Sequence, residues 1–259
     1  MALSDGHIPP IFVSHLRPSL GGAAARDEEL ATWARDLPRP RAILVVSSHW
    51  QANVLSRGST AARPARLREP DEPETPGAIA WSAPGAPDLA YELHQVLPVE
   101  REPARAWDRG VWMPLAAMFP DADVPVLQLS LVLGATPRSL FALGRKLGVL
   151  AARGVLLLGS GAITHNLEAL DPRPDAPPIG WAREFDSWIA NLLADAEHEE
   201  LLQWRTKAPN ARLAHPAGAH LDPLFVITGA ASLYEHGVGF PLRGFDHGTL
   251  SRRCIQFGR

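Results

Sequence analysis

Four short apolar runs dominate the hydrophobic pattern of the first 161 residues. Each run is continuous and β-branched or leucine-rich, and each leads into small or polar residues. They are IPPIFVSH (8–15), RAILVVSSH (41–49), VPVLQLSLV (124–132) and GVLLLGSG (154–161). Short runs of this kind predict strands that are buried on both faces, as in a parallel sheet.

Longer segments with a helical spacing of apolar residues lie between and after these runs. They cover residues 21–37, 86–97, 136–154, 180–204 and 219–237. In one of them, Thr136 suits the N-cap, Pro137 the first helical position and Gly154 the stop. Strands that alternate with helices predict an α/β fold with a mixed, largely parallel central sheet covered by helices on both faces. We find no repeat or boundary, and expect one domain over residues 1–259.

Two stretches have a less regular pattern. Residues 57–80 are rich in Pro, Arg and Glu and predict a long surface loop. A loop of that length in a compact domain is often a lid or a binding segment. Residues 240–258 predict one or two further strands.

Composition narrows the class of protein. The chain has 259 residues, of which 46% are hydrophobic, and a formal net charge of −3. The apolar fraction is enough for a large core. The slightly negative net charge gives no electrostatic reason to expect nucleic-acid binding. Cys254 is the single cysteine, which excludes an internal disulfide and a cysteine-rich metal site. With no signal pattern and no apolar run near ~20 residues, we expect a cytoplasmic, non-membrane protein that is a monomer or small homo-oligomer.

Histidines at the ends of strands are the candidate chemistry. His15 and His49 end the first two runs, and His165 follows the fourth. Because ligands of open α/β sheets bind at the carboxyl ends of strands, these imidazoles are expected to meet at one edge. His215 and His220 flank the start of a late helix and could add a ligand. Singly, each histidine fits an ordinary loop or core residue; as a set they favour a metal site with about three protein ligands. The remaining histidines that we interpret as solvated are His7, His94, His198 and His236.

Six blocks, in order, carry a resemblance to a known family. They are IFVSHLRPS, LPRPRAILVVSSHW, WDRGVWMPLAAMFPDADVPVLQLSL, GVLLLGSGAITHNL, HPAGAHLDPLFVITGAA and GFDHGTLSRRCIQFG. Together they run nearly end to end and resemble the class III extradiol ring-cleavage dioxygenases, in the branch similar to DOPA 4,5-dioxygenase. The resemblance implies one Fe(II) or Zn(II) per chain. It also implies the opening of a substituted catechol with O₂, a reaction of aromatic compound catabolism.

The resemblance also implies roles for individual residues. His15, His49 and His220 would bind the metal. His165 matches the acid/base histidine of the family, close enough that it could also touch the metal. His215 would lie just outside the ligands, as a candidate for substrate binding.

Two departures from the family pattern bear on activity. In HLRP, Leu16 and Arg17 replace small residues next to His15, and in DRG, Arg109 stands where a second active-site histidine is expected. Arginine stays protonated and cannot act as a base, but it can bind a carboxylate through two hydrogen bonds. Arg17 and Arg109 therefore favour an anionic substrate, unless they are ordinary surface arginines or mark a drift to other chemistry.

Two other function classes compete with the dioxygenase. One is a zinc hydrolase-like enzyme that uses three histidines and a metal-bound water. The other is a non-catalytic relative that binds a ligand or only keeps the fold. The identity of the bound metal distinguishes the zinc hydrolase-like enzyme from the dioxygenase. The absence of O₂ uptake on catechols would indicate the non-catalytic relative.

Overall fold

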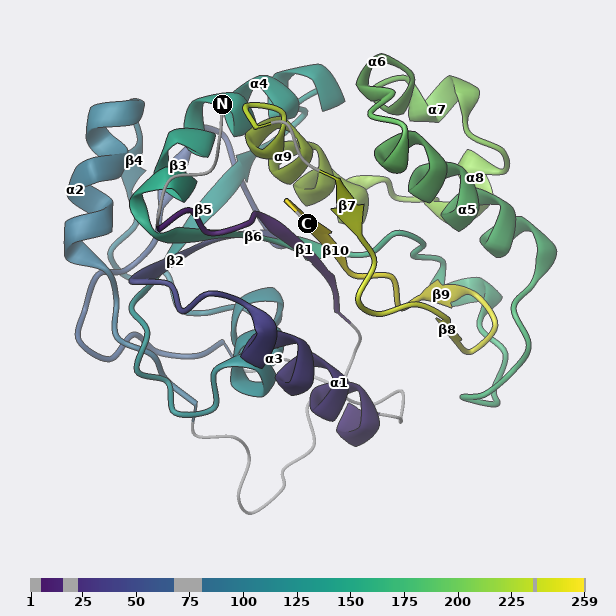
Figure 1. Ribbon diagram of the computed structural model, residues 1–259, viewed down its shortest axis with the longest axis horizontal. Coiled ribbons are helices and arrows are strands. Elements are labelled where there is room, and N and C mark those ends of the chain that lie inside the picture. Colours follow the sequence, from purple (N-terminus) through teal and green to yellow (C-terminus); the bar gives the residue numbers. More distant parts are fainter. Residues whose placement is uncertain (1–5, 16–22, 68–80, 235–236, 259) are drawn as a thin grey trace.

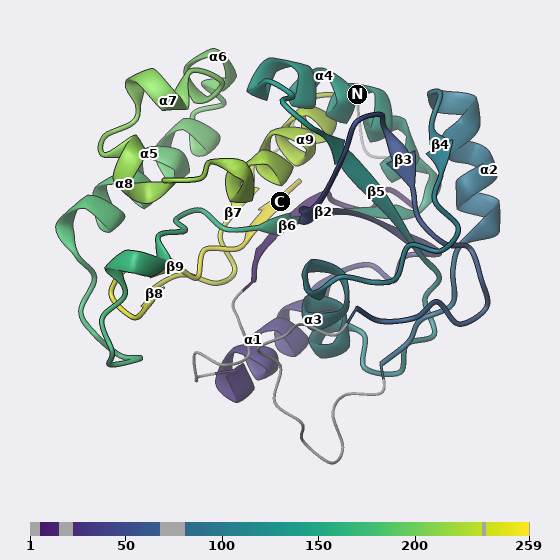
Figure 2. The same cartoon turned by 180° about the vertical axis from the view of Figure 1, so that it is seen from behind.

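The sheet of this protein has parallel strands at its centre and helices on both faces (Figures 1 and 2). The computed structural model describes residues 6–15, 23–67, 81–234 and 237–258. Within these ranges an eight-stranded sheet has the order β4-β3-β5-β2-β6-β1-β10-β7, and β8 and β9 form a small antiparallel sheet. The predicted α/β fold is confirmed. The strands are β1 (Ile11–Ser14), β2 (Ala42–Ala52), β3 (Ser56–Arg57), β4 (Glu100–Arg101), β5 (Val126–Val132), β6 (Val155–Gly161), β7 (Val238–Gly239), β8 (Phe245–Asp246), β9 (Leu250–Ser251) and β10 (Ile255–Phe257).

The four predicted runs form the centre of the sheet. β1 pairs with β6, β6 with β2, and β2 with β5, all in parallel. Parallel neighbours end at the same edge of a sheet, so the residues after these strands are brought together. β2 carries an irregularity, because its register with β5 shifts between Val46 and Gln51. His49 lies in this shifted segment.

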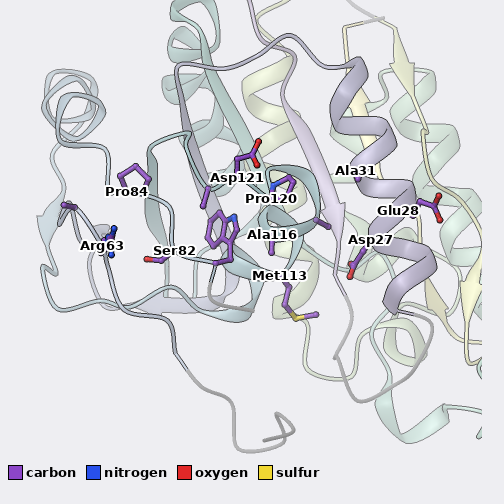
Figure 3. Close-up of a pocket in the computed structure, with 14 residues that line it drawn as sticks. Asp27, Glu28, Ala31, Arg63, Ser82, Pro84, Met113, Ala116, Pro120 and Asp121 are labelled. Carbon is purple, nitrogen blue, oxygen red and sulfur yellow. The ribbon is translucent and has the colours of Figure 1, made fainter. Parts of the chain in front are cut away.

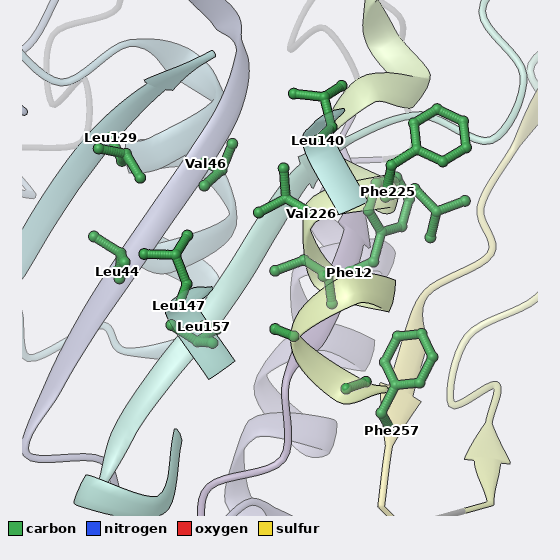
Figure 4. Packing of buried hydrophobic residues seen from close by; sticks show 14 of the residues in the cluster. Phe12, Leu44, Val46, Leu129, Leu140, Leu147, Leu157, Phe225, Val226 and Phe257 are labelled. Atoms are coloured by element: carbon green, nitrogen blue, oxygen red, sulfur yellow. The ribbon is translucent and has the colours of Figure 1, made fainter. Parts of the chain in front are cut away.

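The two faces of the sheet pack against different helices. Successive side chains of a strand point to opposite faces, so Ile43 and Val45 join the core under α1 and α3. Leu44 and Val46 join the larger core with α2, α4, α5 and α9 (Figure 4). The helices are α1 (Ala23–Asp36), α2 (Pro87–Val96), α3 (Arg109–Met118), α4 (Pro137–Leu147), α5 (Gly180–Ala194), α6 (His198–Leu201), α7 (Trp204–Lys207), α8 (Ala211–Ala214) and α9 (Asp222–Ala231). Three 3₁₀ turns accompany them: η2 (Gly148–Arg153), η3 (Leu167–Ala169) and η4 (Ala219–Leu221).

Several element boundaries differ from the sequence prediction. The helix predicted over 180–204 is interrupted, because Ala196 adopts a φ of 56° and the chain turns before α6. The helix over 136–154 begins as predicted, with a Thr136 cap, but its last six residues form η2 before Gly154. Helix α3 was not predicted, because Pro114 lies inside it and breaks the expected pattern. No helix in the described part of the chain is both long and apolar enough to cross a membrane.

The two irregular stretches also differ in part. The predicted surface loop over 57–80 begins in β3, and residues 57–59 are buried. This part of the prediction is wrong, because the segment pairs with β4 and β5. Residues 68–80 lie outside the described residues. The C-terminal stretch 240–258 contains three short strands rather than one or two.

Helices α4 and α9 pack so closely that glycine is required at their contact. A Cβ atom on Gly144 would lie 1.9 Å from the carbonyl oxygen of Val226. A Cβ on Gly229 would lie 2.1 Å from the carbonyl oxygen of Phe141. Because these neighbours are backbone atoms, the clash can be relieved only if the helices separate.

We therefore expect Gly144→Ala to lower the free energy of unfolding by about 1–3 kcal/mol, the usual cost of overpacking. Gly180→Ala is the matched control, because Gly180 opens α5 and a Cβ there meets no atom within 4 Å. That change should be neutral or slightly stabilising, since alanine favours helix over glycine by up to ~1 kcal/mol. Urea denaturation measures both, and equal effects would contradict the packing argument.

Candidate active site

Four imidazoles lie together at the carboxyl edge of the sheet. His15 follows β1, His49 lies in β2, His165 follows β6, and His220 lies in η4. The Nε2 atoms of His15 and His49 are 2.8 Å apart. The ring of His220 is centred 5.4 Å from that of His49 and 6.4 Å from that of His15. The predicted meeting of the strand-end histidines is therefore what the geometry shows.

His15 is the most buried of the four imidazoles. Its backbone N–H donates to the carbonyl of Gly161 (2.9 Å), which continues the β1–β6 ladder by one residue. Its Nδ1 lies 2.9 Å from the hydroxyl of Ser160, a buried residue of β6. When Nδ1–H donates to this hydroxyl, the lone pair of Nε2 points toward His49. A second partner at the far nitrogen is the usual way in which a protein orients a metal-binding histidine.

His165 and His220 are held by the backbone of neighbouring loops. The N–H of His165 donates to the carbonyl of Ala214 (2.8 Å), and the N–H of Ala162 donates to the carbonyl of His220 (2.9 Å). A Cβ on Gly161 would lie 2.2 Å from that His220 carbonyl, so only glycine allows this approach. Gly161, the last residue of β6, is thus required by the position of His220.

The residues on either side of His165 fix its loop. The Thr164 hydroxyl donates to the carbonyl of Thr249 and accepts from the N–H of Ser251. The Asn166 side-chain amide donates to the carbonyl of Leu213 (2.8 Å). His165 is therefore presented by a short segment tied to β9 on one side and to α8 on the other.

The rings of His165 and His220 are stacked. Their centroids are 3.6 Å apart and their planes are inclined by 6°. The lone pair of an imidazole nitrogen lies in the plane of its ring, so two parallel, stacked rings cannot both direct lone pairs at one ion between them. In the described part of the chain, no group of three or more His, Cys, Asp or Glu side chains is arranged to hold a metal ion.

Burial lowers the pKa of two imidazoles of the cluster, His15 and His220. The pKa of His15 is well below its ordinary value of 6.5, because the ring is buried and because His49, His220 and Arg109 add positive charge nearby. Burial, followed by the influence of His165 and His49, lowers the pKa of His220 to about 2. Near neutral pH both rings are therefore neutral, which is the form that binds a metal or accepts a proton.

Arg109 faces the cluster from the first turn of α3. Its Nε donates to Nε2 of His49 at 3.3 Å, and the residue is 8% exposed. Each oxygen of the carboxylate of the preceding residue, Asp108, accepts two hydrogen bonds, and Asp108 forms an ion pair with Arg105 (2.9 Å).

The remaining candidates are placed differently. His215 is buried between the rings of Phe185 and Trp204, and its Nε2 is 2.8 Å from the carbonyl oxygen of Ile163. This position ties the His165 segment to the turn before η4. Arg17, like Leu16, lies outside the described residues.

Among the histidines interpreted as solvated, His7 contradicts that interpretation. It is buried, and its ring packs edge-on against Tyr234 with centroids 4.4 Å apart. The reason is tertiary, because the segment before β1 runs beneath the end of α9. His94 and His198 are half-buried, and His236 lies outside the described residues.

The cavity shown in Figure 3 is separate from the imidazoles. It has a volume of about 1030 Å³ and lies between α1, α3 and the segments around Arg63 and Trp81. Its lining residues include Asp27, Met113 and Asp121 but none of the candidate histidines. We therefore build the site on the imidazole cluster and not on this cavity.

The sequence analysis missed the residues that support the cluster. Ser160, Gln128 and Arg105 were not singled out. Ser160 and Arg105 each contact a candidate histidine, and Gln128 binds the Asp108 carboxylate that Arg105 also binds. Gln128 carried a usable signal, since a single glutamine inside the apolar run VPVLQLSLV must find partners when it is buried. Arg105 had no such signal in an arginine-rich chain.

The architecture is that of an α/β protein, and its candidate site lies at the carboxyl ends of the central strands. A model of the catalytic LigB subunit of aromatic ring-opening dioxygenase matches residues 2–248. The chain belongs to this LigB family. The resemblance to extradiol ring-cleavage dioxygenases that the sequence blocks carry is thereby confirmed.

Two relatives and one solved structure illustrate the likeness. A 4,5-DOPA dioxygenase extradiol of Beta vulgaris is 35% identical over 252 residues, covering 89% of this chain and 90% of that protein. A protein of the same name from Escherichia coli (strain K12) is 31% identical over 269 residues, covering 99% and 97%. The crystal structure of an uncharacterized protein from Escherichia coli K12 matches with a TM-score of 0.77 and 27% identity, covering 97% of this chain and 100% of that one.

The buried His215 makes stability depend on pH. Burial lowers its pKa from 6.5 to about 3, against the hydrogen bond to Ile163, which raises it. Below pH ~6.5 the unfolded chain takes up a proton that the folded chain refuses. The free energy of unfolding should therefore fall as the pH drops from about 6.5 toward 3, by up to about 1.4 kcal/mol per pH unit for this residue.

We expect His215→Gln, which keeps a neutral donor but does not titrate, to flatten this dependence. Urea denaturation of the chelator-treated protein at intervals between pH 7 and pH 4.5 measures the slope. If wild type and variant lose stability with the same slope, His215 does not resist protonation in the folded state.

Proposed function

We propose that this protein is a metal-dependent extradiol dioxygenase that opens the ring of a substituted catechol with O₂. The observation that carries the proposal is the cluster of four imidazoles at the carboxyl edge of the sheet, in a chain of the LigB family. Burial keeps two of them, His15 and His220, neutral. The names of the relatives from Beta vulgaris and Escherichia coli support a catechol as the class of substrate.

The donor set suits one divalent Fe or Zn ion. Imidazole nitrogens are usual ligands of such ions. The Nε2 atoms of His15 and His49 lie 2.8 Å apart, so these two side chains would together hold the ion. His220 would be the third ligand after its ring turns out of the stack with His165. Such an ion, when bound, acts as a Lewis acid toward the catechol oxygens and leaves room for O₂.

His165 fits the role of acid and base in this proposal. It is half-buried, so it can reach a substrate, and its loop is fixed on both sides. Its stacking on His220 makes it a poor ligand for an ion that His220 also binds. A neutral imidazole at this place can take the proton of a catechol hydroxyl and later return it.

We expect His15→Ala, His49→Ala and His220→Ala each to lower metal occupancy sharply while the fold is kept. His165→Ala is the matched contrast, because it removes an imidazole from the same cluster. That variant should keep much of its metal and lose turnover. Elemental analysis after reconstitution with Fe(II), followed by O₂ uptake on a panel of catechols, measures both properties. Full metal content in all three ligand variants would show that the ligand assignment is wrong, and complete loss in His165→Ala would make His165 a ligand.

Arg109 bears on the choice of substrate. Its guanidinium is a permanent positive charge within 3.3 Å of His49 Nε2, and the residue is buried. In the family pattern a histidine stands at this position, so a proton carrier is replaced by a fixed charge. We infer a preference for catechols that bear a carboxylate, with slower turnover than in relatives that have the histidine. Arg17 would add to the same preference. His215 would support the substrate pocket indirectly, because its ring holds the segment that carries His165.

We therefore expect Arg109→Ala to raise KM for a 3,4-dihydroxybenzoate-type substrate more than for uncharged catechol. The difference should be on the order of 1.5–3 kcal/mol, the cost of a lost charge-assisted hydrogen bond. Arg109→His should lose the same preference but gain turnover on uncharged catechol. Steady-state kinetics on the two substrates measures this difference. Equal changes in KM for both would show that Arg109 does not bind the substrate carboxylate.

One observation favours a second candidate function. The Nε2 of His49 accepts a hydrogen bond from Arg109, and it would have to give up this bond to bind an ion. Arg109 also stays protonated, so it cannot carry a proton as the histidine of the family pattern would. A zinc-binding relative with hydrolase-like activity, or with no catalytic activity, is therefore the second candidate. Stoichiometric metal without O₂ uptake on any catechol of the panel would favour this candidate.

A further inference from the structure

Asp108 is a buried carboxylate at the start of α3. It is 1% exposed and serves as the N-cap of the helix, since its Oδ1 accepts from the N–H of Gly110 (2.9 Å). The same oxygen accepts from the hydroxyl of Ser47 (2.8 Å). Its other oxygen accepts from the side chains of Arg105 (2.9 Å) and Gln128. The Asp108 carboxylate thus accepts four hydrogen bonds, whose donors come from α3, β2, β5 and the loop before α3.

Two of these donors lead to the backbone of His49. Ser47 Oγ, which donates to Asp108, accepts from the N–H of His49 (3.2 Å). Arg105 Nη2, which pairs with Asp108, also lies 3.4 Å from the carbonyl oxygen of His49. The guanidinium of Arg105 further lies over the ring of Trp50, 4.9 Å from its centre. Both backbone groups of His49 are therefore linked to the same carboxylate.

The contacts of Ser47 and Arg105 with His49 lie where β2 is not in regular register with β5. The register of β2 with β5 shifts between Val46 and Gln51, and His49 lies inside the shifted segment. A residue in such an irregular segment lacks regular ladder hydrogen bonds with β5, so other contacts help to set its direction. For the backbone of His49, Ser47 and Arg105 supply such contacts.

The close approach of α3 to the bulge shows that the arrangement is tightly packed. A Cβ on Gly110 would lie 2.2 Å from Ser47 Oγ and 3.2 Å from Asp108 Oδ1. The glycine of the DRG motif is therefore needed for Ser47 to reach the carboxylate. Asp108, Gly110 and Ser47 act as one unit.

We propose that Asp108 is a positioning residue, which sets the direction of the His49 imidazole by holding the β2 bulge through Ser47 and Arg105. The inference rests on the proposed function only in taking His49 as a metal ligand. Asp108 itself touches neither metal nor substrate. Its charge is needed because an acceptor for four donors must be an ionised carboxylate, with two oxygens and no proton of its own.

Zinc binding tests this inference without any need for turnover. We expect Asp108→Ala and Ser47→Ala each to weaken zinc binding by about 10- to 100-fold, the usual effect of removing a group that orients a metal ligand. Because Asp108 and Ser47 act along one path, the double variant should be little weaker than the worse single variant. Competition with a chromophoric chelator measures affinity, and the visible spectrum of the Co²⁺-loaded protein reports the ligand geometry directly.

Thr136→Ala provides a matched control. Thr136 is the N-cap of α4, as Asp108 is of α3, and it makes a capping box with Ser139 away from the histidines. Its removal costs a helix cap without touching the bulge, so zinc affinity and the Co²⁺ spectrum should equal those of wild type. Thermal unfolding of the metal-free variants shows how much general stability each change removes.

The outcomes are distinct. Wild-type zinc affinity in both Asp108→Ala and Ser47→Ala would overturn the positioning role and leave the proposed metal site intact. Equal weakening in Thr136→Ala would overturn it too, because the effect would then be one of general stability. If Asp108→Ala does not fold, Ser47→Ala decides alone. Failure of the wild-type protein to bind zinc or Fe(II) would instead refute the metal site of the proposed function.

Discussion

The parallel pairing of β1, β6, β2 and β5 is the constraint on which the rest of the structure depends. Helices cover both faces of these strands, so their interiors must be apolar on both sides. Polar chemistry can then enter only where the strands end. Because all four strands run in the same direction, their ends lie at one edge, and residues from distant parts of the sequence meet there. His15, His49 and His165 reach the site in this way.

Local geometry then determines how the imidazoles are aimed. The end of β6 brings Ser160 to Nδ1 of His15, and Gly161 lets the His220 carbonyl approach. The irregular segment of β2 takes His49 out of the regular ladder. The backbone N–H and carbonyl of His49 then contact Ser47 and Arg105, which both bind Asp108. Small residues and an irregular strand are thus requirements of the site.

Electrostatics determines the protonation state of His15 and His220. Burial and mutual repulsion keep His15 and His220 neutral, so their lone pairs are available near neutral pH. The charge of Arg109 adds to this effect, because a positive neighbour disfavours a protonated imidazole. An arginine here suits an anionic partner but cannot move protons. The proton chemistry of the proposed reaction therefore falls to His165.

The sequence by itself determined the four central strands, most helices, the α/β class and the strand-end histidines. It did so because burial on both faces and helical periodicity leave direct marks in the order of residues. It did not predict α3, whose inner Pro114 hides its helical pattern, nor the break at Ala196. Only the tertiary structure decided that His165 stacks on His220, that Asp108 pairs with Arg105, and that His7 is buried. The contacts of His165 with His220 and of His7 with Tyr234 join segments distant in sequence. Arg105 and Asp108 are only three residues apart, but the network that holds them includes Ser47 and Gln128 from other strands. The geometry of all three contacts therefore depends on the packing of the whole fold.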